Sequence, residues 1–503
     1  MHTPNQMSDK IVSKENETSN KSKLRELFKD HLTNEMFAAV QEVYYSPHIA
    51  IKLFLSTFLL ASYALASYTT LKLVMSYFEY GITNSVRTFY EVPCEFPKVS
   101  ICNVNPFSSK YGYEFLRNIT NGTFEIFPEN MSSYQKMKQF IVTQIKANGY
   151  TNNMTDLFKK SLGHDLMDSM LLCSFNLNEC TSADFSWYYD SLYGNCYSFN
   201  SGFNSTGQKR DASVSYLAGN WHGLIVDFYV RSYENFSLFN SLWGGSGAIL
   251  RIDNVSHVID HIKDGIFAAS GASTFVALNR QFETILPKPY SQCEIESYDK
   301  STNFDSDLYR LIQNSSFDYT QNFCLEQCLL NLQKDKCGCQ SPFYKSVIDA
   351  RKCSSLYDTG CSMNAYLNVF MKNNYIQSVC MPQCPLECYS NKFTYTTSSY
   401  NLNGDFYVEK IKNNSNLASD FVTEEINVDT VRNSFVRLYV FYESLSYTVS
   451  EEAPQWDVFS LTANIGGNLG LFMGVSFFSI CEIITTIIEL YFYKIERNKI
   501  NHF

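Results

Sequence analysis

Residues Val458–Cys481 read VFSLTANIGGNLGLFMGVSFFSIC, twenty-four residues without a formal charge. A membrane-spanning helix needs about 20 apolar residues, so this segment is long enough to cross a bilayer. After Glu482 the sequence stays apolar to Tyr493, interrupted only by Glu489. One helix from Val458 to Tyr493 would be about 54 Å long, against a hydrocarbon core of about 30 Å. We therefore expect the segment to tilt, to project from the membrane or to break at its glycines.

Polar residues inside this segment predict a pore. Gly466, Gly470 and Gly474 recur every four residues and share one helix face, which is also typical of closely packed membrane helices. Carboxylates at membrane depth are costly and usually face protein or a water-filled path. A spacing of seven residues joins Asn468, Val475, Glu482 and Glu489 into one stripe, which symmetric copies would turn into acidic rings suited to cations. The pore-lining candidates are Asp457, Asn464, Asn468, Gly470, Glu482 and Glu489.

A second apolar run lies near the N-terminus. Leu53–Leu71 contains nineteen uncharged residues between Lys52 and Lys72. It begins about fifty residues into the chain and lacks a short apolar core followed by a small-residue cleavage site, so a cleaved signal peptide is a poor interpretation. We expect two membrane spans, over residues 49–77 and 453–493.

The cysteines and glycosylation sequons indicate which part of the chain is extracellular. Of sixteen cysteines, fifteen fall between Cys94 and Cys388, and Cys481 lies in the second apolar run. Such a block is typical of an oxidising compartment. Nine sequons lie in the same middle region, although Asn16 and Asn20 also match the pattern. The nine are Asn118, Asn121, Asn130, Asn153, Asn204, Asn235, Asn254, Asn314 and Asn413. We expect a multi-pass plasma-membrane protein with residues 78–452 outside and both termini, 1–48 and 494–503, cytoplasmic.

Composition excludes several classes of protein. The 503 residues carry a net charge of −10, so the chain lacks the basic excess that nucleic-acid binding requires. Its mean hydropathy of −0.19 shows that it does not consist mostly of membrane spans. No Walker loop or His-Glu-x-x-His motif is present, and Ser246 in WGGSGA lacks the spacing of a nucleophile elbow. We expect neither an enzyme nor a cofactor.

Five motifs in order carry a family resemblance. They are Phe96–Phe107 (FPKVSICNVNPF), Gly194–Asn200 (GNCYSFN), Leu286–Cys293 (LPKPYSQC), the cysteine pattern from Cys324 to Cys388, and Asn464–Ser476 (NIGGNLGLFMGVS). Together they resemble the epithelial sodium channel/degenerin family, which includes acid-sensing and peptide-gated channels. The resemblance covers roughly residues 50–493. It implies that Gly474, Val475 and Ser476 form a selectivity filter and that Glu482 is the acidic residue below it.

The resemblance also implies the architecture. The expected fold is an α+β membrane protein, a homo- or heterotrimer, with two transmembrane helices and a large, disulfide-rich, β-centred extracellular domain. That domain would have a finger over about 104–180 and a thumb over about 294–392. Conduction would be sodium-selective and blocked by amiloride. The implied disulfides are Cys102–Cys196, Cys173–Cys180, Cys293–Cys388, Cys324–Cys384, Cys328–Cys380, Cys337–Cys361 and Cys339–Cys353, which leave Cys94 unassigned.

Three features stay open at this point. The family usually carries a His-Gly pair before the first span, but Phe28–Val40 has none, and the pair His222–Gly223 lies outside. We interpret His222 as a structural histidine rather than a proton sensor. Tyr77 is either an interfacial anchor or a residue that couples the ectodomain to gating. Residues Leu24–Val43 form either a helix at the membrane face or a solvated tail.

Patterning predicts a mixed ectodomain. Helical periodicity occurs over 133–145, 155–170, 306–331 and 365–374, and alternation typical of strands over 187–230, 250–278 and 406–447.

The stimulus that opens the channel, and the protein's function itself, each have several candidates. A neuropeptide of the Arg-Phe-amide type is slightly favoured as the stimulus over protons acting on crowded carboxyls, with constitutive or mechanical opening third. A two-span scavenger-type receptor would share the topology, disulfides and glycans but not the glycine-rich second span. An ATP-gated channel would also be a trimer with two spans, but its ectodomain signatures differ from those of this chain. Zinc bound by the cysteine cluster is a minor alternative. The expected partners are sodium ions, the lipid bilayer, related subunits, the extracellular ligand and amiloride as blocker.

Overall fold

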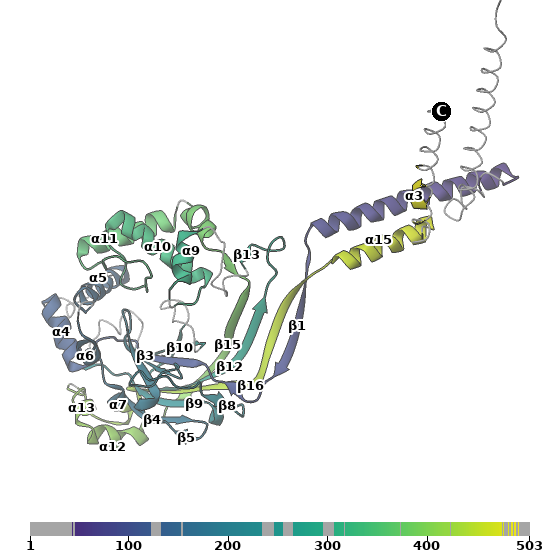
Figure 1. The fold of residues 1–503 in the computed structure, drawn as a ribbon. Coiled ribbons are helices and arrows are strands. Elements are labelled where there is room, and N and C mark those ends of the chain that lie inside the picture. The colour runs from purple at the N-terminus through teal and green to yellow at the C-terminus, as the bar shows by residue number, and fades with distance from the viewer. Residues whose placement is uncertain are drawn as a thin grey trace, which may run out of the picture. The chain divides into compact units, whose positions relative to one another are not determined.

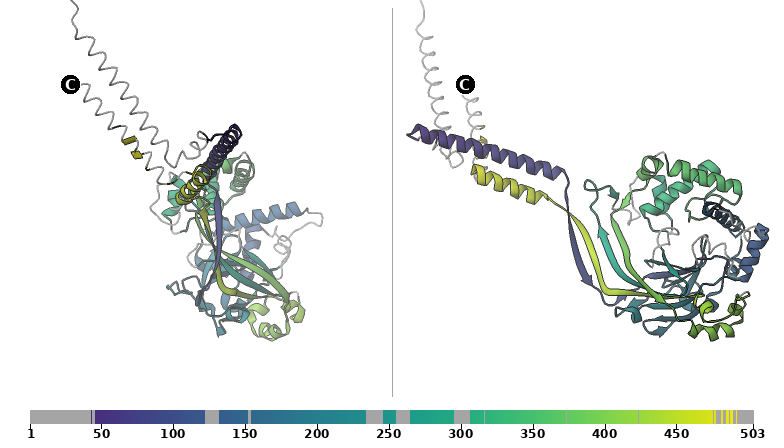
Figure 2. Two further views of the ribbon diagram at one scale, coloured as in Figure 1. Left: turned by 90° about the vertical axis from the view of Figure 1, so that its right-hand side faces the viewer. Right: turned by 180° about the vertical axis from the view of Figure 1, so that it is seen from behind.

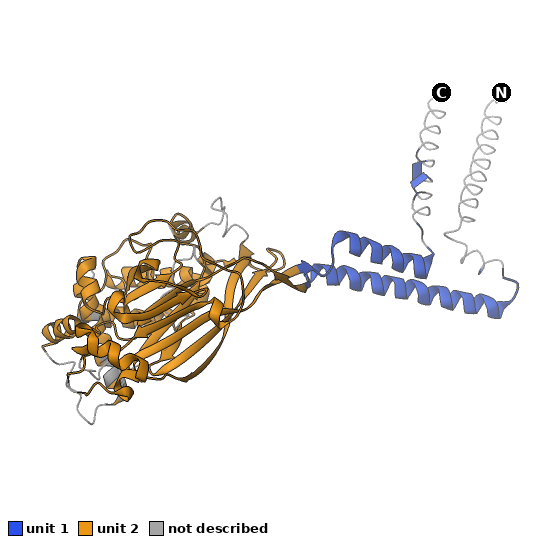
Figure 3. Ribbon diagram, turned by 90° about the horizontal axis from the view of Figure 1, so that it is seen from below, with its two compact units in different colours: residues 1–83, 453–503 blue, residues 84–452 orange. Residues whose placement is uncertain are grey.

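A computed structural model of the chain describes residues 43, 46–121, 132–151, 154–233, 246–254, 265–294, 306–315, 317–372, 374–422, 424–474, 476, 481, 484–485, 487–488 and 491. The predictions for Leu24–Val43 and for the His-Gly position fall almost wholly outside these residues. The chain divides into two compact units (Figure 3). One combines Met1–Thr83 with Ala453–Phe503, and the other is Asn84–Glu452. Each unit is described by itself.

The first unit contains two apolar helices that lie alongside each other (Figures 1 and 2). Helix α3 spans Ile49–Phe78 and has a mean hydropathy of 1.8 in its most apolar window. Among the described residues it is the one helix long and apolar enough to cross a membrane, because α15, Val458–Met473, has 16 residues. Ala66 is the one described side chain of α3 that is buried. The two helices therefore present apolar surface outward, as helices that face lipid or another chain do.

Hydrogen bonds join the ends of these two helices that lead into the strands. The Gln455 backbone N–H donates to the Gly81 carbonyl at 2.9 Å. The Thr83 hydroxyl donates to the Ala453 carbonyl at 3.2 Å, and the Trp456 indole N–H donates to Ser76 Oγ at 3.2 Å. These hydrogen bonds fix the position of the end of α3 relative to the start of α15.

The larger sheet of the second unit has seven strands in the order β15–β12–β16–β9–β4–β5, with β1 also paired to β16. Strands β12 and β16 are parallel, whereas β12 with β15, β16 with β9, and β9 with β4 are antiparallel. The bounds are β1 Ile82–Tyr90, β4 Met170–Phe175, β5 Asn178–Glu179, β9 Leu224–Tyr229, β12 Ala272–Thr284, β15 Tyr389–Asn401 and β16 Phe435–Pro454.

A five-stranded sheet has the order β11–β10–β3–β7–β6. Its strands are β3 Lys98–Asn103, β6 Phe185–Asp190, β7 Gly194–Phe199, β10 Gly247–Asp253 and β11 Ile266–Ala269. Two short pairs complete the strands: β2 Cys94–Glu95 with β8 Val214–Ser215, and β13 Cys293–Glu294 with β14 Leu386–Glu387.

Alternating side chains of β16 supply two separate cores. Val436, Leu438 and Val440 point into the core shared with the five-stranded sheet, where residues such as Ile101 and Leu250 also lie. Phe435 belongs to a different core, with Tyr229, Tyr407 and Ile411. Helices α12 Asp405–Asn413, α13 Ser415–Ala418 and α14 Val428–Arg432 cover that second face. A period of two residues thus places one strand between two apolar layers.

The segment expected to form the finger, 104–180, has helices before strands β4 and β5. Its helices are α4 Lys110–Thr120, α5 Ser133–Thr151, α6 Asp156–Ser161 and α7 Leu166–Ser169. Side chains of Ser109, Thr155 and Asp165 accept backbone N–H bonds at the first turns of α4, α6 and α7, which sets where each begins.

The segment expected to form the thumb, 294–392, packs its helices around cysteines. They are α9 Asp307–Gln313, α10 Gln321–Cys337, α11 Leu356–Asn364, the π-helices η6 Ala365–Phe370 and η7 Ile376–Cys380, and the 3-10 helix η8 Met381–Gln383; short 3-10 turns η2 Ser182–Asp184 and η3 Asn220–His222 lie elsewhere. Cys324 and Cys328, one turn apart on α10, are both buried and disulfide-bonded. Helix α10 ends at Gly338, whose φ is +65°.

Three of the expected elements differ in the structure. The helix expected over 155–170 is two helices, because Asp165 caps a new one. The helix expected over 306–331 is also two, α9 and α10, because the Thr320 side chain caps α10. The strand expected over 406–447 begins only at Phe435, and α12–α14 precede it. Asn414 and Asn427 accept backbone N–H bonds at the starts of α13 and α14. Local capping outweighs a weak period-two pattern there.

Candidate ion pathway

Helix α15 begins at the acidic residue Asp457. Its carboxylate accepts the Ser460 backbone N–H at 2.7 Å, and its carbonyl accepts the Leu461 N–H at 2.9 Å. An aspartate at this position satisfies an otherwise orphaned N–H and lies at the positive end of the helix dipole. The structure therefore fixes an exposed carboxylate at the start of α15.

The middle of α15 carries amides and glycines. Asn464 is exposed and donates its side-chain N–H to the Ser460 carbonyl at 2.7 Å, whereas Asn468 is half-buried. A Cβ added at Gly466 or Gly467 would meet no atom within 4 Å among the described residues. Packing of α15 within its own chain therefore does not require these two glycines. Gly470 is exposed on the same helix.

Gly474 ends the helix in the left-handed conformation. Its φ is +71° and ψ is +16°, and its N–H donates to the Gly470 carbonyl at 3.1 Å. A residue with a Cβ would be strained there by roughly 1 kcal/mol. The last turn of a helix leaves carbonyls without an intrahelical partner, and its end carries partial negative charge. The end of α15 thus offers carbonyl oxygens of the kind that can replace water around a cation.

The other predicted pathway residues are only partly described. Ser476 is described and exposed. Val475, Glu482 and Glu489 lie outside the described residues.

Tyr77 lies in the last turn of α3 and is half-buried. Its ring meets Phe78 edge-on, with 5.3 Å between ring centroids. Trp456, which donates a hydrogen bond to Ser76, is not among the predicted site residues. A tryptophan at the boundary of an apolar span is a signal that could have identified it.

Disulfides hold the ectodomain. The structure joins Cys102–Cys196, Cys173–Cys180, Cys293–Cys388, Cys324–Cys384, Cys328–Cys380, Cys337–Cys361 and Cys339–Cys353, the same seven pairs that the resemblance implies. Every cysteine from Cys324 to Cys388 is used in this way, so none has a free thiolate for zinc. Among the described residues no cluster of three or more His, Cys, Asp or Glu could hold a metal. Cys94 is free and buried, and burial raises the pKa of its thiol. Cys481 is free and exposed.

A buried carboxylate links the seven-stranded sheet to the helices that cover it. Asp227 of β9 is fully buried. Arg437 of β16 donates to it through Nε at 2.5 Å and Nη2 at 2.7 Å, and the Tyr407 hydroxyl of α12 donates at 2.6 Å. The hydrogen bond to Asp227 raises the pKa of Arg437, and burial raises the pKa of Tyr407. No sequence signal predicted this network, because Asp227 and Arg437 are 210 residues apart.

Two further buried carboxylates have polar partners. Asp190 pairs with Arg251 at 2.9 Å, and both side chains are at most 3% exposed. Asp420 accepts the Tyr229 hydroxyl at 3.0 Å and lies 3.0 Å from His164 Nε2. These pairs connect strands and helices that are distant in the sequence.

Among the described residues of the ectodomain, three carboxyls have a pKa that departs from the ordinary range, and all three are shifted downward. The Arg351 guanidinium holds the pKa of Asp358 well below its usual range, and the Lys392 ammonium lowers that of Glu283. Burial alone would raise the pKa of Asp184, but the Thr181 backbone N–H and Arg210 outweigh it, and the result is a lowered pKa. A proton sensor built on crowded carboxyls would show the opposite shift.

The remaining predicted residues lie at the surface or in turns. His222 is half-buried in η3, and its carbonyl accepts the Ser215 hydroxyl at 3.5 Å. The sequon asparagines Asn118, Asn121, Asn314 and Asn413 are exposed, whereas Asn204 and Asn254 are half-buried and hydrogen-bonded. Asn130, Asn153 and Asn235 lie outside the described residues.

Comparison with known proteins connects these features. The sequence model of the family described as amiloride-sensitive sodium channel matches residues 32–486. The FMRFamide-activated amiloride-sensitive sodium channel of Cornu aspersum is 23% identical over 86% of this chain and 78% of its own length. Acid-sensing ion channel 1A of Danio rerio is 24% identical over 88% and 83%, and acid-sensing ion channel 1 of Gallus gallus is 25% identical over 87% and 77%.

The matched range runs from before α3 to beyond the end of α15 and includes all seven disulfides. This chain belongs to the amiloride-sensitive sodium channel family.

Proposed function

We propose that the chain is a subunit of a trimeric, sodium-selective, amiloride-sensitive channel of the plasma membrane that an extracellular ligand opens. The observation that carries the proposal is α15, an apolar helix that carries Asn464 and several glycines at exposed positions and ends at Gly474, whose φ is positive. The family membership supports the same function.

The roles along the pathway follow from chemistry. Asp457 at the outer end and the rings of Glu482 and Glu489 would concentrate cations, because carboxylates at membrane depth attract them. Gly474, Val475 and Ser476 would form the narrow filter. Asn464, Asn468 and Gly470 would line the wider part above it.

The topology is part of the proposal. Residues 49–77 and 453–493 would span the membrane, 78–452 would be extracellular and glycosylated at the nine sequons, and 1–48 and 494–503 would be cytoplasmic. Tyr77 would take part in coupling the ectodomain to gating.

A peptide is favoured over protons as the opening ligand. The relatives include both a channel described as FMRFamide-activated and several described as acid-sensing, so similarity alone favours neither. The lowered pKa values of Asp184, Glu283 and Asp358 count against these three carboxyls as proton sensors, because they stay ionised through mild acidification. Proton gating and constitutive opening are the alternatives within the family, and a scavenger-type receptor is the alternative of another class.

Whole-cell current in oocytes that express only this chain tests the function. The bath is stepped from pH 7.4 to 5 and then receives a panel of amidated peptides, with amiloride as the control. We expect an amiloride-blocked sodium current under a peptide. A surface-exposed, glycosylated protein that stays silent even with related subunits would favour the receptor.

Gly474→Arg and Ser476→Cys test the filter. We expect either change to alter sodium selectivity or amiloride block, because both alter the narrow segment after α15. Unchanged permeability ratios and block in both variants would remove the filter assignment. Ser460→Cys, at the exposed start of the helix, is the matched control for Ser476→Cys.

A further inference from the structure

Strand β1, Ile82–Tyr90, follows α3 closely in the chain, and among the described strands it pairs with β16 alone. Eight of its nine side chains are exposed. A strand with one paired edge and little buried surface opens easily, because few contacts must break. The contacts at the far end of β1 therefore decide how firmly this strand is attached to the sheet.

Phe89 and Glu91 fasten that end of β1. The Phe89 ring stacks on Tyr447 of β16, with 5.5 Å between the ring centroids and 25° between the ring planes. Just after the strand, the Glu91 backbone N–H donates to the Leu445 carbonyl at 3.0 Å, and the Glu91 carboxylate accepts a hydrogen bond from Arg280 Nη2. Glu91 thus ties β1 to β16 through its backbone and to β12 through its side chain.

The pairing of β12 with β16 is irregular at this point. Leu278 lies opposite Tyr442, but Arg280 lies opposite Tyr447, so β16 makes a bulge between the two tyrosines. A bulge disrupts the regular ladder locally and re-aims side chains. The carbonyl of Leu445, which lies inside the bulge, accepts the N–H from the end of β1. The attachment of β1 is thus built where the sheet departs from regular pairing.

Arg280 is buried among aromatic rings, with its side chain 8% exposed. The guanidinium carbon lies 5.2 Å from the ring centroid of Tyr447, 5.7 Å from that of Tyr442 and 6.0 Å from that of Phe282. These are distances at which a cation is attracted to the face of a ring. Arg280 Nε is buried and has no hydrogen-bond partner among the described residues. The Glu91 carboxylate therefore compensates a charge that water barely reaches.

The two partners of this ion pair differ in exposure. The Glu91 side chain is 46% exposed, so water can solvate its carboxylate when Arg280 is absent. Arg280 has little such access, so loss of the Glu91 charge leaves a buried guanidinium without compensation. The buried partner is thus the fixed point to which the end of β1 is attached.

We propose that Arg280 is a positioning residue for channel opening. Its ion pair with Glu91 holds the end of β1 to the sheet, and that hold carries a ligand-driven change of the ectodomain into the strand that continues to α3. The role in opening rests on the proposed function, whereas the hold on β1 does not. A pair that served stability alone would change the melting temperature and leave the response to ligand unchanged.

Hydrogen–deuterium exchange of the purified full-length protein tests the hold. We expect Arg280→Met to speed the exchange of amides in β1 about tenfold, because a weaker attachment makes local opening more frequent. Arg280→Lys keeps the charge and should restore most of the protection. Unchanged exchange of β1 in Arg280→Met would overturn the proposal.

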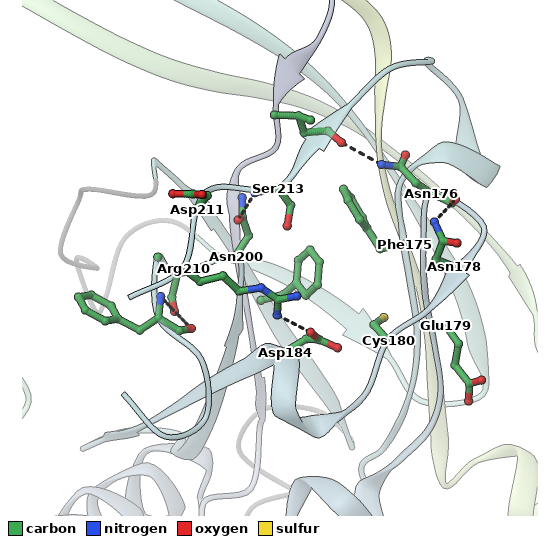
Figure 4. A pocket seen from close by; sticks show the side chains of 15 residues that line it. Phe175, Asn176, Asn178, Glu179, Cys180, Asp184, Asn200, Arg210, Asp211 and Ser213 are labelled. Carbon is green, nitrogen blue, oxygen red and sulfur yellow. Dashed lines mark hydrogen bonds and ion pairs between the residues drawn. The ribbon is translucent and has the colours of Figure 1, made fainter. Parts of the chain in front are cut away.

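Arg210→Met is the matched control. It breaks another arginine pair of the same unit, that of Arg210 with Asp184 at the cavity beside the β4–β5 hairpin (Figure 4). We expect exchange of β1 in this variant to match that of the unmodified protein. An increase equal to that of Arg280→Met would show that loss of any such pair loosens β1, and would refute the specific hold.

The role in opening is tested in oocytes with the amidated peptide or the acid step that opens the unmodified channel. Arg280→Met and Glu91→Gln should each raise the concentration for half-maximal sodium current about fivefold or more. The double variant should raise it no further, because each change breaks the same link. Arg280→Lys should stay within about twofold, since the charge is kept. Unchanged responses, or effects that add in the double variant, would refute the role.

Failure of the proposed function is distinguishable from failure of the hold. A surface protein that conducts under no stimulus would remove the proposed function and with it the role in opening, and exchange of β1 would still decide whether Arg280 holds the strand. Faster exchange of β1 with an unchanged ligand response would keep the hold and refute its role in opening. Should Arg280→Met not reach the surface, Glu91→Gln replaces it, because that side chain is partly exposed.

Discussion

Arg437→Met should loosen the helices α12–α14 from the seven-stranded sheet. The guanidinium of Arg437 makes two hydrogen bonds to Asp227, which is fully buried. After the substitution the Tyr407 hydroxyl would be the partner that remains for the carboxylate among the contacts described above. Met preserves most of the apolar stem of arginine, so the change isolates the charge and its hydrogen bonds.

The magnitude follows from burial. Removing one partner of a buried ion pair costs about 3–5 kcal/mol, because the other charge is left without compensation. The Arg437 side chain is 24% exposed, so water reaches it in part, and we expect a value near the lower end, about 3 kcal/mol. For a unit of this size the apparent melting temperature should fall by about 4 °C.

Fluorescence-detected thermal denaturation of the full-length protein measures this change. Arg432→Met is the matched control, because Arg432 pairs with Asp429 on α14 with both side chains at least 37% exposed. That exposed pair contributes about 0–1 kcal/mol. Breaking it should therefore lower the apparent melting temperature by no more than about 2 °C. Equal shifts for Arg437→Met and Arg432→Met would refute the reasoning. Asp227→Asn combined with Arg437→Met should recover part of the loss, because no buried charge then remains unpaired.

Three further outcomes are expected. Glu482→Ala should change divalent permeability or single-channel conductance, because a ring of charge holds cations near the narrow path, and identical values would count against that role. Cys328→Ser should lower surface expression, since the Cys328–Cys380 bond contributes about 3 kcal/mol even though Cys324–Cys384 already closes the loop around it; normal surface biotinylation would contradict this. The thumb should lose stability as pH falls below about 4, because the lowered pKa of Asp358 stabilises the fold only while the carboxyl is ionised. Asp358→Asn should make that acid-dependent loss smaller in a pH series of thermal denaturation, while Asp184 and Glu283, whose pKa values are also lowered, keep their share, and an unchanged pH profile would be the contrary result.

The candidate pathway was open to prediction because its signals are local. Apolar length identifies α3, and the spacing of glycines and asparagines within α15 is what predicts the pathway face, which stays a prediction. The position of the break at Gly474 follows from a glycine that can adopt a positive φ. Resemblance supplied the seven disulfide pairs, which spacing could not select from the many possible.

Other elements escaped prediction because competing local signals were weak. The segment 406–432 alternates apolar and polar residues, yet it folds into α12–α14 because Asn414 and Asn427 cap helices there and Tyr407 and Ile411 reach an apolar core. Short helices depend on such tertiary packing more than on their own periodicity.

The sequence by itself determined the apolar helices, the extracellular character of the middle region and the family, since each depends on residues that are neighbours in the chain or on motifs in order. Only the tertiary structure decided that Asp227 meets Arg437, and that Asp190 meets Arg251. These contacts depend on how strands pair across long separations. A charge is buried and paired, or exposed and available to a ligand, only once that pairing is made.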